Sequence, residues 1–521
     1  MRLVGVLLAL GLVNLAYLPA DASHARALNQ VSGPSAARVT QATSPVPRGP
    51  NFVVILLDDM RADDFVAMPA TDLLVGGKGA WFDNAYSPFP LCCPARATLL
   101  TGQYAHNHEV LSNLAPEGGV TAFDPRHTIA VWLKREGYST AFIGKYLNGY
   151  GVQTARRYVP PGWTSWQGLT GNPHNYRDFA LNINGSVRSY SGRYQTQVLG
   201  RRSVGFIERA GARPFLLVTS FLAPHSGSPI EEDDPPGGPD CFWTSLCWNA
   251  TPAVAPAYAD TASGQLMPMT EAYGEQDVDD KPAHIAALPA FTPEADWMAV
   301  HQERYEQRLE SIRSVDDQVR NIVAALADAG KLRNTYIVVT SDNGYLMGEH
   351  RIPFGKVHPY EPSTRIPMVL RGPGVPAGVR VRQLVGLHDL VPTVLRATGT
   401  YGAQTVPLDG TSLLPFTTSS SPGAARDLLL EAGPADAVDD ASLARSTVAA
   451  QPYRGIRTDT GWKYVEYNHG GVEMYDLNAD PAELENLAHD PALVDQRILL
   501  DQALDQLALC SGRPCRRDTG R

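Results

Sequence analysis

The sequence predicts an α/β protein in which a large, mixed but mostly parallel sheet is sandwiched between helices and followed by a smaller C-terminal α+β subdomain. Three observations predict this class. Continuous apolar runs, typical of central parallel strands covered on both faces, recur along the chain. Helical patterns lie between them, as a βαβ plan requires. The length of 521 residues suits one large domain plus a smaller one.

The N-terminus has the layout of a secretory signal peptide. Met1-Arg2 precedes a mostly apolar run over 3–18, and small residues follow at 25–27. We expect a signal peptide over 1–27 and a disordered leader over 28–49. A membrane anchor is the alternative, but the run is short for a bilayer span. The protein is therefore expected to be secreted or extracytoplasmic, without stable insertion into a membrane.

Composition excludes one class of partner. Hydrophobic residues make up 44% of the chain, which is ordinary for a globular protein. The net charge of −10 argues against a general nucleic-acid binder, because such proteins gain affinity from excess lysine and arginine. Any anionic substrate must therefore be held by local positive charge.

The six cysteines fall into three close pairs. In an exported protein, Cys241/Cys247 and Cys510/Cys515 are candidates for short-loop disulfides. Adjacent cysteines such as Cys92 and Cys93 bridge only with strain. Cys93 is therefore expected to be a buried thiol.

Four apolar segments are each followed at once by polar residues. The first, 52–57, ends at two adjacent carboxylates, which can converge only where the chain already turns; a solvated turn is the alternative for that pair. The other three span 140–143, 215–221 and 336–340. Ligands bind outside the carboxyl ends of strands in open α/β sheets, so the polar side chains are expected in one crevice. They are Asp58, Asp59, Lys145, His225, Asp342 and Asn343.

Helices and one long irregular stretch lie among these strands. Helices are expected over 127–136 and 309–326, where apolar residues recur at three- and four-residue steps. Asp316 and Asp317 lie off the apolar stripe and are expected on a solvated face. The stretch 226–293 lacks periodicity, which predicts a functional loop or disorder. Its aromatic residues either stack on a substrate ring or pack the loop onto the domain.

A loose Ser/Pro/Gly segment divides the chain. We expect a main domain over 50–416, which carries all the candidate site residues, and a C-terminal subdomain over 425–521. The subdomain is expected to hold a hairpin of 464–467 with 472–475, and a helix from about 493 to 509.

The segment Leu91–Gly102 combines a cysteine, a helix-starting proline and an arginine within one turn. Good helix formers follow, and Gly102 can end the helix. Backbone N–H groups and the positive end of the helix dipole then face whatever lies beside Cys92, and Arg96 adds a full charge one turn in. The segment therefore predicts an anion site.

The spacing of Cys92, Pro94 and Arg96, with Thr101-Gly102 after it, resembles the signature of the sulfatase family, whose cysteine is oxidised to formylglycine after synthesis. Further matches follow in the family's order: Asp58-Asp59, Gly144-Lys145, Pro224-His225, Asp342-Asn343-Gly344 and Lys356. Within the family, the chain most resembles the N-acetylglucosamine-6-sulfatase branch, by its segments 91–94, 102–108 and 144–148.

The resemblance implies an alkaline phosphatase/sulfatase-like fold and hydrolysis of a sulfate ester, on a sugar such as 6-sulfated N-acetylglucosamine or on an aryl group. Cys92, converted by a formylglycine-generating enzyme and hydrated to a diol, would attack sulfur with one hydroxyl and expel sulfate with the other. Lys145 and Lys356 would clamp the sulfate oxygens, and Arg96 would support the diol. His225 would protonate the leaving oxygen.

The resemblance also implies one divalent metal. Its ligands would all donate oxygen, which selects a hard cation, calcium first and magnesium second. Zinc would require more nitrogen or sulfur ligands. The implied ligands are Asp58, Asp59, Asp342, Asn343 and the modified Cys92.

The sequence departs from the family pattern after Lys145. Many sulfatases have histidine two positions later, where this chain has Leu147. His106 and His108 are the candidates for the role of that histidine. Two other functions stay open: a formylglycine-dependent phosphonate or phosphate ester hydrolase, and an inactive protein that binds sulfated glycans.

Overall fold

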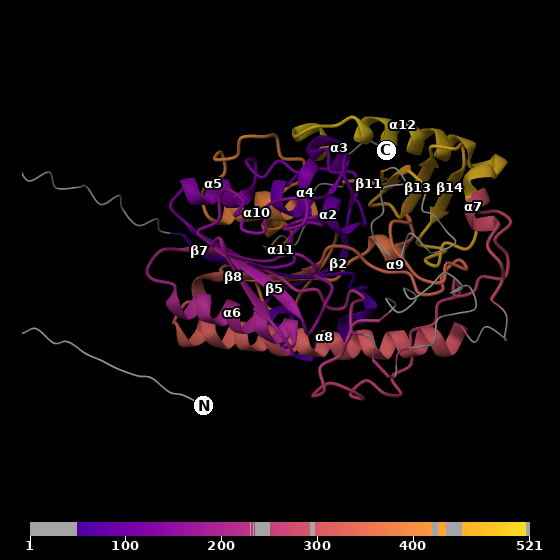
Figure 1. Ribbon diagram of the computed structural model, residues 1–521. Helices are drawn as coiled ribbons and strands as arrows, with labels where there is room; N and C mark the ends of the chain where they lie inside the picture. Colours follow the sequence, from indigo (N-terminus) through magenta and orange to yellow (C-terminus); the bar gives the residue numbers. More distant parts are fainter. Residues whose placement is uncertain are drawn as a thin grey trace, which may run out of the picture. The chain divides into compact units, whose positions relative to one another are not determined.

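The computed structural model describes residues 49–229, 231–232, 234, 251–291, 297–418, 426–433 and 451–516 (Figure 1). Val46–Arg521 forms one compact unit. The predicted signal peptide, the leader up to residue 48 and the predicted Cys241/Cys247 clip lie outside the described residues. Among the helices in these ranges, none is long and apolar enough to cross a membrane.

A ten-stranded sheet lies at the centre of this unit, in the order β10-β2-β9-β8-β1-β7-β3-β4-β5-β6. The run β8-β1-β7-β3-β4 is parallel throughout, and β2 pairs in parallel with β10. Strands β9, β5 and β6 pair antiparallel with their neighbours, so the sheet is mixed but mostly parallel, as predicted. The strands are β1 (Asn51–Leu57), β2 (Ala80–Tyr86), β3 (Ser139–Gly144), β4 (Ser165–Leu169), β5 (Phe179–Ile183), β6 (Ser186–Tyr190), β7 (Phe215–Ser220), β8 (Thr335–Ser341), β9 (Met368–Arg371) and β10 (Val379–Gly386).

Helices cover both faces of the sheet (Figure 1). Every residue of β1 is buried, which explains its continuous apolar run. Alternate side chains of β1 enter opposite cores, Phe52, Val54 and Leu56 on one face and Val53, Ile55 and Leu57 on the other. The first core includes residues of α2 (Cys92–Thr101), α5 (Ile129–Arg135) and α10 (Leu390–Ala397), and the second includes residues of α6 (Gln195–Arg209) and α8 (Trp297–Asp328).

The predicted elements of the main domain are present. The four apolar segments are β1, β3, β7 and β8, and the two helical patterns are α5 and α8. Helix α8 begins at Trp297, well before the apolar pattern. Its first turns bury His301, Arg304 and Tyr305 rather than aliphatic residues, so a stripe of aliphatic side chains does not mark them.

The predicted solvated position of Asp316 is wrong. Its side chain is buried and accepts the backbone N–H groups of Ala70 and Thr71 at 2.9 and 2.7 Å. These residues lie in α1 (Pro69–Thr71), which covers this side of α8. Asp317 does reach solvent, where it pairs with Arg320.

The C-terminal region forms a separate antiparallel sheet, β11-β12-β13-β14. Strands β13 and β14 are the predicted hairpin, and α12 is the predicted helix, which shares a core with this sheet. The elements are β11 (Leu428–Ala432), β12 (Tyr453–Arg457), β13 (Trp462–Tyr467), β14 (Val472–Asp476) and α12 (Val494–Ala508). Short helices elsewhere are α3 (Ala105–His108), α4 (Gly119–Ala122), α7 (Ala283–Ala286), α9 (Glu361–Thr364) and α11 (Leu414–Thr418).

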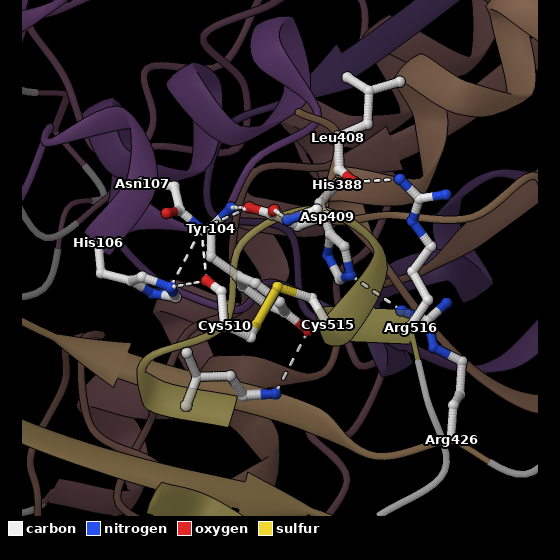
Figure 2. The surroundings of a disulfide bond; sticks show 12 residues. Tyr104, His106, Asn107, His388, Leu408, Asp409, Arg426, Cys510, Cys515 and Arg516 are labelled. Carbon is white, nitrogen blue, oxygen red and sulfur yellow. Dashed lines mark hydrogen bonds between the residues drawn. A yellow bond between two sulfur atoms is a disulfide. The ribbon is translucent and has the colours of Figure 1, made fainter. Parts of the chain in front are cut away.

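A disulfide joins Cys510 and Cys515, as the sequence predicts (Figure 2). Figure 2 shows the loop that it closes beside the segment that follows α2. Asp409 links the two, because it accepts the backbone N–H groups of Tyr104 and Gly512 at 2.8 and 2.6 Å. The disulfide loop is thereby fixed close to α2, the helix that begins at Cys92.

Candidate active site

The four strand ends converge, as expected. The backbone N–H of Asp59, after β1, donates to Asp342 Oδ1, after β8, at 3.1 Å. Lys145 Nζ, after β3, lies 2.5 Å from Asp58 Oδ2, and His225 Nε2, after β7, lies 3.7 Å from Asp59 Oδ2. One buried cluster therefore collects side chains from four parallel strands.

Cys92 lies at the first position of α2 and faces this cluster. Its Sγ lies 3.2 Å from Lys356 Nζ, 3.6 Å from Asp58 Oδ1 and 3.8 Å from Lys145 Nζ. Metal-ligating atoms of Asp58, Asp59, Cys92 and His225 lie within 4.8 Å of one another. Cys92 therefore lies among the carboxylate, lysine and histidine side chains that the sequence predicts around it.

Cys93 is a separate, structural thiol. It is fully buried and unbridged, as predicted. Its backbone N–H donates to Asn113 Oδ1 at 2.9 Å, and its Sγ accepts the N–H of Asn148 at 3.1 Å. Burial raises the pKa of the Cys93 thiol to about 12, which keeps it protonated and unreactive.

Arg96 connects α2 to four strand ends. Its Nε donates to Asp342 Oδ2 at 2.9 Å, and a terminal nitrogen lies 3.3 Å from Asp58 Oδ2. Its other terminal nitrogen donates to Lys145 O at 2.7 Å and to Ser220 Oγ at 2.8 Å. Burial lowers the pKa of Arg96, but Asp58 and Asp342 outweigh that effect and raise it above its usual range.

The charges of the cluster compensate one another, three carboxylates against three cations. Burial raises the pKa of Asp58, yet Lys145 and Arg96 hold it well below its usual range. The pKa of Lys145 rises above its usual range because Asp58 and Cys92 outweigh the effect of burial. Burial and the nearby Asp58 raise the pKa of Asp342 to about 7. Lys356 Nζ neutralises the remaining carboxylate, since it lies 2.6 Å from Asp59 Oδ1.

The donor set fits a hard divalent cation. Asn343 Nδ2 donates to Asp59 Oδ1 at 2.7 Å and to Gly344 O at 2.8 Å. Asn343 Oδ1 is buried and has no hydrogen-bond partner among the described residues. An unpaired buried oxygen is unfavourable unless something binds it. Together with the carboxylates of Asp58, Asp59 and Asp342, it supplies the oxygen ligands that calcium and magnesium prefer.

The predicted substitutes for the missing histidine are wrong. His108 Nε2 bonds to Thr98 Oγ1 at 3.0 Å, and His106 bonds to Glu431 and to Cys510 O. Both histidines are engaged away from Cys92. Each lies in α3, directly after α2, where the chain turns toward the C-terminal sheet instead of the crevice.

Several residues that shape the site have no sequence signal. Asn113 accepts the backbone N–H of Cys93 in the first turn of α2, and Arg308 donates to the carbonyl of Asp59 at 2.5 Å. The ring of His174 stacks on His225, with centroids 4.8 Å apart. Ser220, which accepts a hydrogen bond from Arg96, could have been predicted, because it lies at the end of β7, one of the predicted strands.

Comparison with known proteins identifies the family. Residues 50–400 match the family described as Sulfatase. The chain belongs to the sulfatase family. Residues 348–509 of this sulfatase also match the family described as N-sulphoglucosamine sulphohydrolase, C-terminal. As a member of this family, the chain is a sulfuric ester hydrolase.

Relatives of this sulfatase match it over most of its length. It is 33% identical to the N-acetylglucosamine-6-sulfatase of Capra hircus over 508 residues, which cover 90% of this chain and 85% of that one. It is 32% identical to the N-acetylglucosamine-6-sulfatase of Homo sapiens over 508 residues, which cover 90% and 86%. A protein solved with its substrate D-glucosamine-2-N,6-O-disulfate matches with a TM-score of 0.67 and 23% identity, covering 88% of this chain and 97% of that one. That likeness shows a shared fold.

Proposed function

We propose that this sulfatase is secreted and hydrolyses the 6-O-sulfate of N-acetylglucosamine or a related glucosamine sugar, with aryl sulfates as surrogate substrates. Identity of about one third to N-acetylglucosamine-6-sulfatases along most of the chain supports the sugar assignment. The predicted signal peptide over 1–27 supports export. The single observation that carries the chemistry is the placement of Cys92 Sγ within 3.8 Å of Asp58, Lys145 and Lys356.

The nucleophile is formylglycine made from Cys92. A formylglycine-generating enzyme uses an external two-electron oxidant to convert the CH2SH group of Cys92 to an aldehyde. The sulfur leaves as hydrogen sulfide, and water then adds to the aldehyde to give two hydroxyls. One hydroxyl attacks sulfur, so that a new O–S bond forms and the bond from sulfur to the sugar oxygen breaks. The second hydroxyl then loses its proton, the C=O bond forms again and sulfate leaves. A serine at position 92 could attack but could not expel sulfate in this way.

The cationic side chains bind the sulfate group and stabilise its developing charge. Lys145 Nζ and Lys356 Nζ lie on two sides of Cys92 Sγ, at 3.8 and 3.2 Å. Each can donate to sulfate oxygens during attack and release. Arg96 orients the cluster through Asp58 and Asp342 and adds positive potential at the helix start.

His225 is the proton donor to the leaving sugar oxygen. Its Nδ1 lies 2.7 Å from Ser226 O, so Nδ1 carries a hydrogen that donates to this carbonyl. Nε2 is then the nitrogen that faces the cluster, 3.7 Å from Asp59 Oδ2. Tyr176 fixes the backbone of the histidine by donating to His225 O at 2.7 Å.

Calcium, with magnesium second, is the metal that the oxygen donors favour. Asp58, Asp59, Asp342, Asn343 and the modified Cys92 would hold it. When bound, a divalent cation polarises oxygens and lowers the energy of developing negative charge. The unpartnered Asn343 Oδ1 is the observation that favours this ligand set over a purely structural carboxylate cluster.

Mass spectrometry combined with kinetics tests the function. The mass of the tryptic peptide that contains residue 92 is expected to be lower than the mass calculated for an unmodified cysteine. The expected difference is that between a CH2SH and a CHO group. The wild type is expected to release sulfate from N-acetylglucosamine-6-sulfate and from an aryl sulfate. Cys92→Ala is expected to abolish release, whereas Cys93→Ser, the adjacent matched control, keeps it.

Two results would contradict the proposal. One is an unmodified Cys92 in mature protein together with full activity of Cys92→Ala. The other is turnover of an aryl phosphonate well above that of the aryl sulfate, which would favour the phosphonate hydrolase alternative.

A further inference from the structure

Arg304, on the inner face of α8, is a buried cation without an anionic partner among the residues that the structure describes. Only 3% of the residue is exposed. Its Nε and one terminal nitrogen, both buried, have no hydrogen-bond partner, and no carboxylate lies within 4.0 Å of the guanidinium in the described part of the chain. Such a group is rare, because burying a charge is unfavourable unless a counter-charge and hydrogen bonds compensate it.

The neighbouring arginines are compensated. Arg308, one turn further along α8, pairs with Asp64 at 2.6 Å and donates to Asp59 O. Arg61 pairs with Glu349 at 2.8 Å and with Asp63 at 2.9 Å. Among these three neighbouring arginines, Arg304 alone has no carboxylate partner among the described residues.

The contacts that Arg304 does make replace only part of its hydration. Its guanidinium lies over the ring of Phe354, 4.1 Å from the centroid, and a cation–π contact compensates a buried charge incompletely. Asp234 acts on Arg304 from beyond ion-pair distance, and its oxygens accept from Glu231 N and Thr251 Oγ1. Burial lowers the pKa of Arg304 to about 10, and the nearby groups do not reverse that shift.

Arg304 lies between two segments that supply the active site. Arg308 lies one turn beyond Arg304 in α8, at a rise of about 6 Å along the helix. Its guanidinium donates a hydrogen bond to the backbone carbonyl of Asp59. The aromatic ring over the guanidinium of Arg304 belongs to Phe354, two residues before Lys356. Phe354 is only half-buried, so the ring that covers the guanidinium lies partly at the surface.

We propose that Arg304 is an anion subsite that binds a second oxyanion of the substrate, a sulfate or carboxylate group other than the sulfate that is hydrolysed. The inference rests on the proposed sulfatase function and extends it to the class of substrate: multiply anionic sugars. Guanidinium is the side chain best suited to planar recognition of sulfate and carboxylate groups. The second oxyanion of the substrate would then pair with the guanidinium of Arg304.

Selectivity between two sugars tests the subsite. The probes are N-acetyl-D-glucosamine-6-O-sulfate, whose nitrogen substituent is neutral, and D-glucosamine-2-N,6-O-disulfate, whose nitrogen carries a second anion. Arg304→Met is expected to raise KM for the disulfate about tenfold, the size of one charge-assisted hydrogen bond, and KM for the monosulfate less than twofold. Arg304→Lys is expected to recover part of the selectivity. Arg320→Met, on the exposed side of α8, is the control and is expected to change neither.

Thermal unfolding separates this role from a structural one. Because a buried unpaired charge is removed, Arg304→Met is expected to unfold at a temperature no lower than wild type. Equal losses toward both sugars, no change toward either, or a large drop in the unfolding temperature would overturn the subsite. Weaker inhibition by inorganic sulfate in Arg304→Met, with unchanged selectivity, would show that the site takes released sulfate and would also overturn it. A wild type that hydrolyses neither sugar would instead refute the proposed function.

Discussion

Asn113 caps α2, the helix that begins at Cys92, because its Oδ1 accepts the backbone N–H of Cys93 at 2.9 Å. The N-cap residue itself, Leu91, has an extended backbone and no side-chain oxygen. Pro94 has no N–H, so the amide of Cys93 is one of few donors in the first turn that need an acceptor. A residue 20 positions later supplies the cap that the local sequence lacks.

Removing this cap is expected to weaken α2 and misplace position 92. Asn113→Ala is expected to lower the free energy of unfolding by about 1 kcal/mol, the usual contribution of an N-cap. It is also expected to lower kcat, with the formylglycine content unchanged. Asn113→Asp keeps the acceptor oxygen at the positive end of the helix and is expected to restore both. Urea unfolding, sulfate release and peptide mass measure the three quantities; an Asn113→Ala protein with wild-type stability would show that Asn113 does not cap.

Much of the site could be predicted from sequence because its residues follow apolar strands directly. Asp58, Lys145 and Asp342 need only the rule that parallel strand ends meet at one edge. The cap at Asn113 and the contact of Arg308 with Asp59 could not be predicted, since their partners lie 20 and 249 residues away and no local pattern connects them. The same reason explains the failed expectation for His106, whose partners Glu431 and Cys510 lie 325 and 404 residues away.

Asp316 and Asp317 are adjacent in α8 and both lie off its apolar stripe, yet only Asp316 is buried. Asp316 accepts the backbone N–H groups of Ala70 and Thr71 and also the hydroxyl of Thr71, all while buried. Asp316→Ala is expected to lower the free energy of unfolding by about 2–4 kcal/mol, because several donors lose a charged acceptor. Asp317→Ala, its exposed neighbour, is expected to cost less than about 1 kcal/mol. Denaturant titration of both variants measures the contrast, and equal effects would mean that Asp316 contributes no more than a surface charge.

Removal of divalent metal is expected to reduce both activity and stability. A chelator should lower the unfolding temperature and stop sulfate release, because a metal that binds only the folded state stabilises that state. Calcium is expected to restore both better than magnesium. Asn343→Leu deletes the unpartnered amide oxygen and is expected to weaken calcium binding about tenfold or more, as calorimetry can measure. An unfolding temperature that neither chelator nor calcium changes would rule out the metal site.

His106 is expected to make stability depend on pH. Its Nδ1 lies 3.0 Å from Glu431 Oε2. Its Nε2 lies 2.8 Å from Cys510 O (Figure 2), so both ring nitrogens face acceptors. Burial lowers the pKa of His106, but the hydrogen bond to Glu431 outweighs it and raises the pKa to about 9. The histidine of the unfolded chain titrates near 6.5. The folded state therefore binds the proton more tightly, and the stabilisation is fully present below about pH 6.5 and lost as the pH rises through 9.

Comparison with His106→Gln isolates this effect from the other titrating groups. The wild type is expected to exceed the variant in free energy of unfolding by about 1–2 kcal/mol below pH 6.5, a value reduced by partial exposure of the pair. The difference is expected to shrink to near zero above about pH 10. A difference between wild type and His106→Gln that stays constant with pH would mean that packing of the imidazole, and not its charge, joins α3 to the disulfide loop.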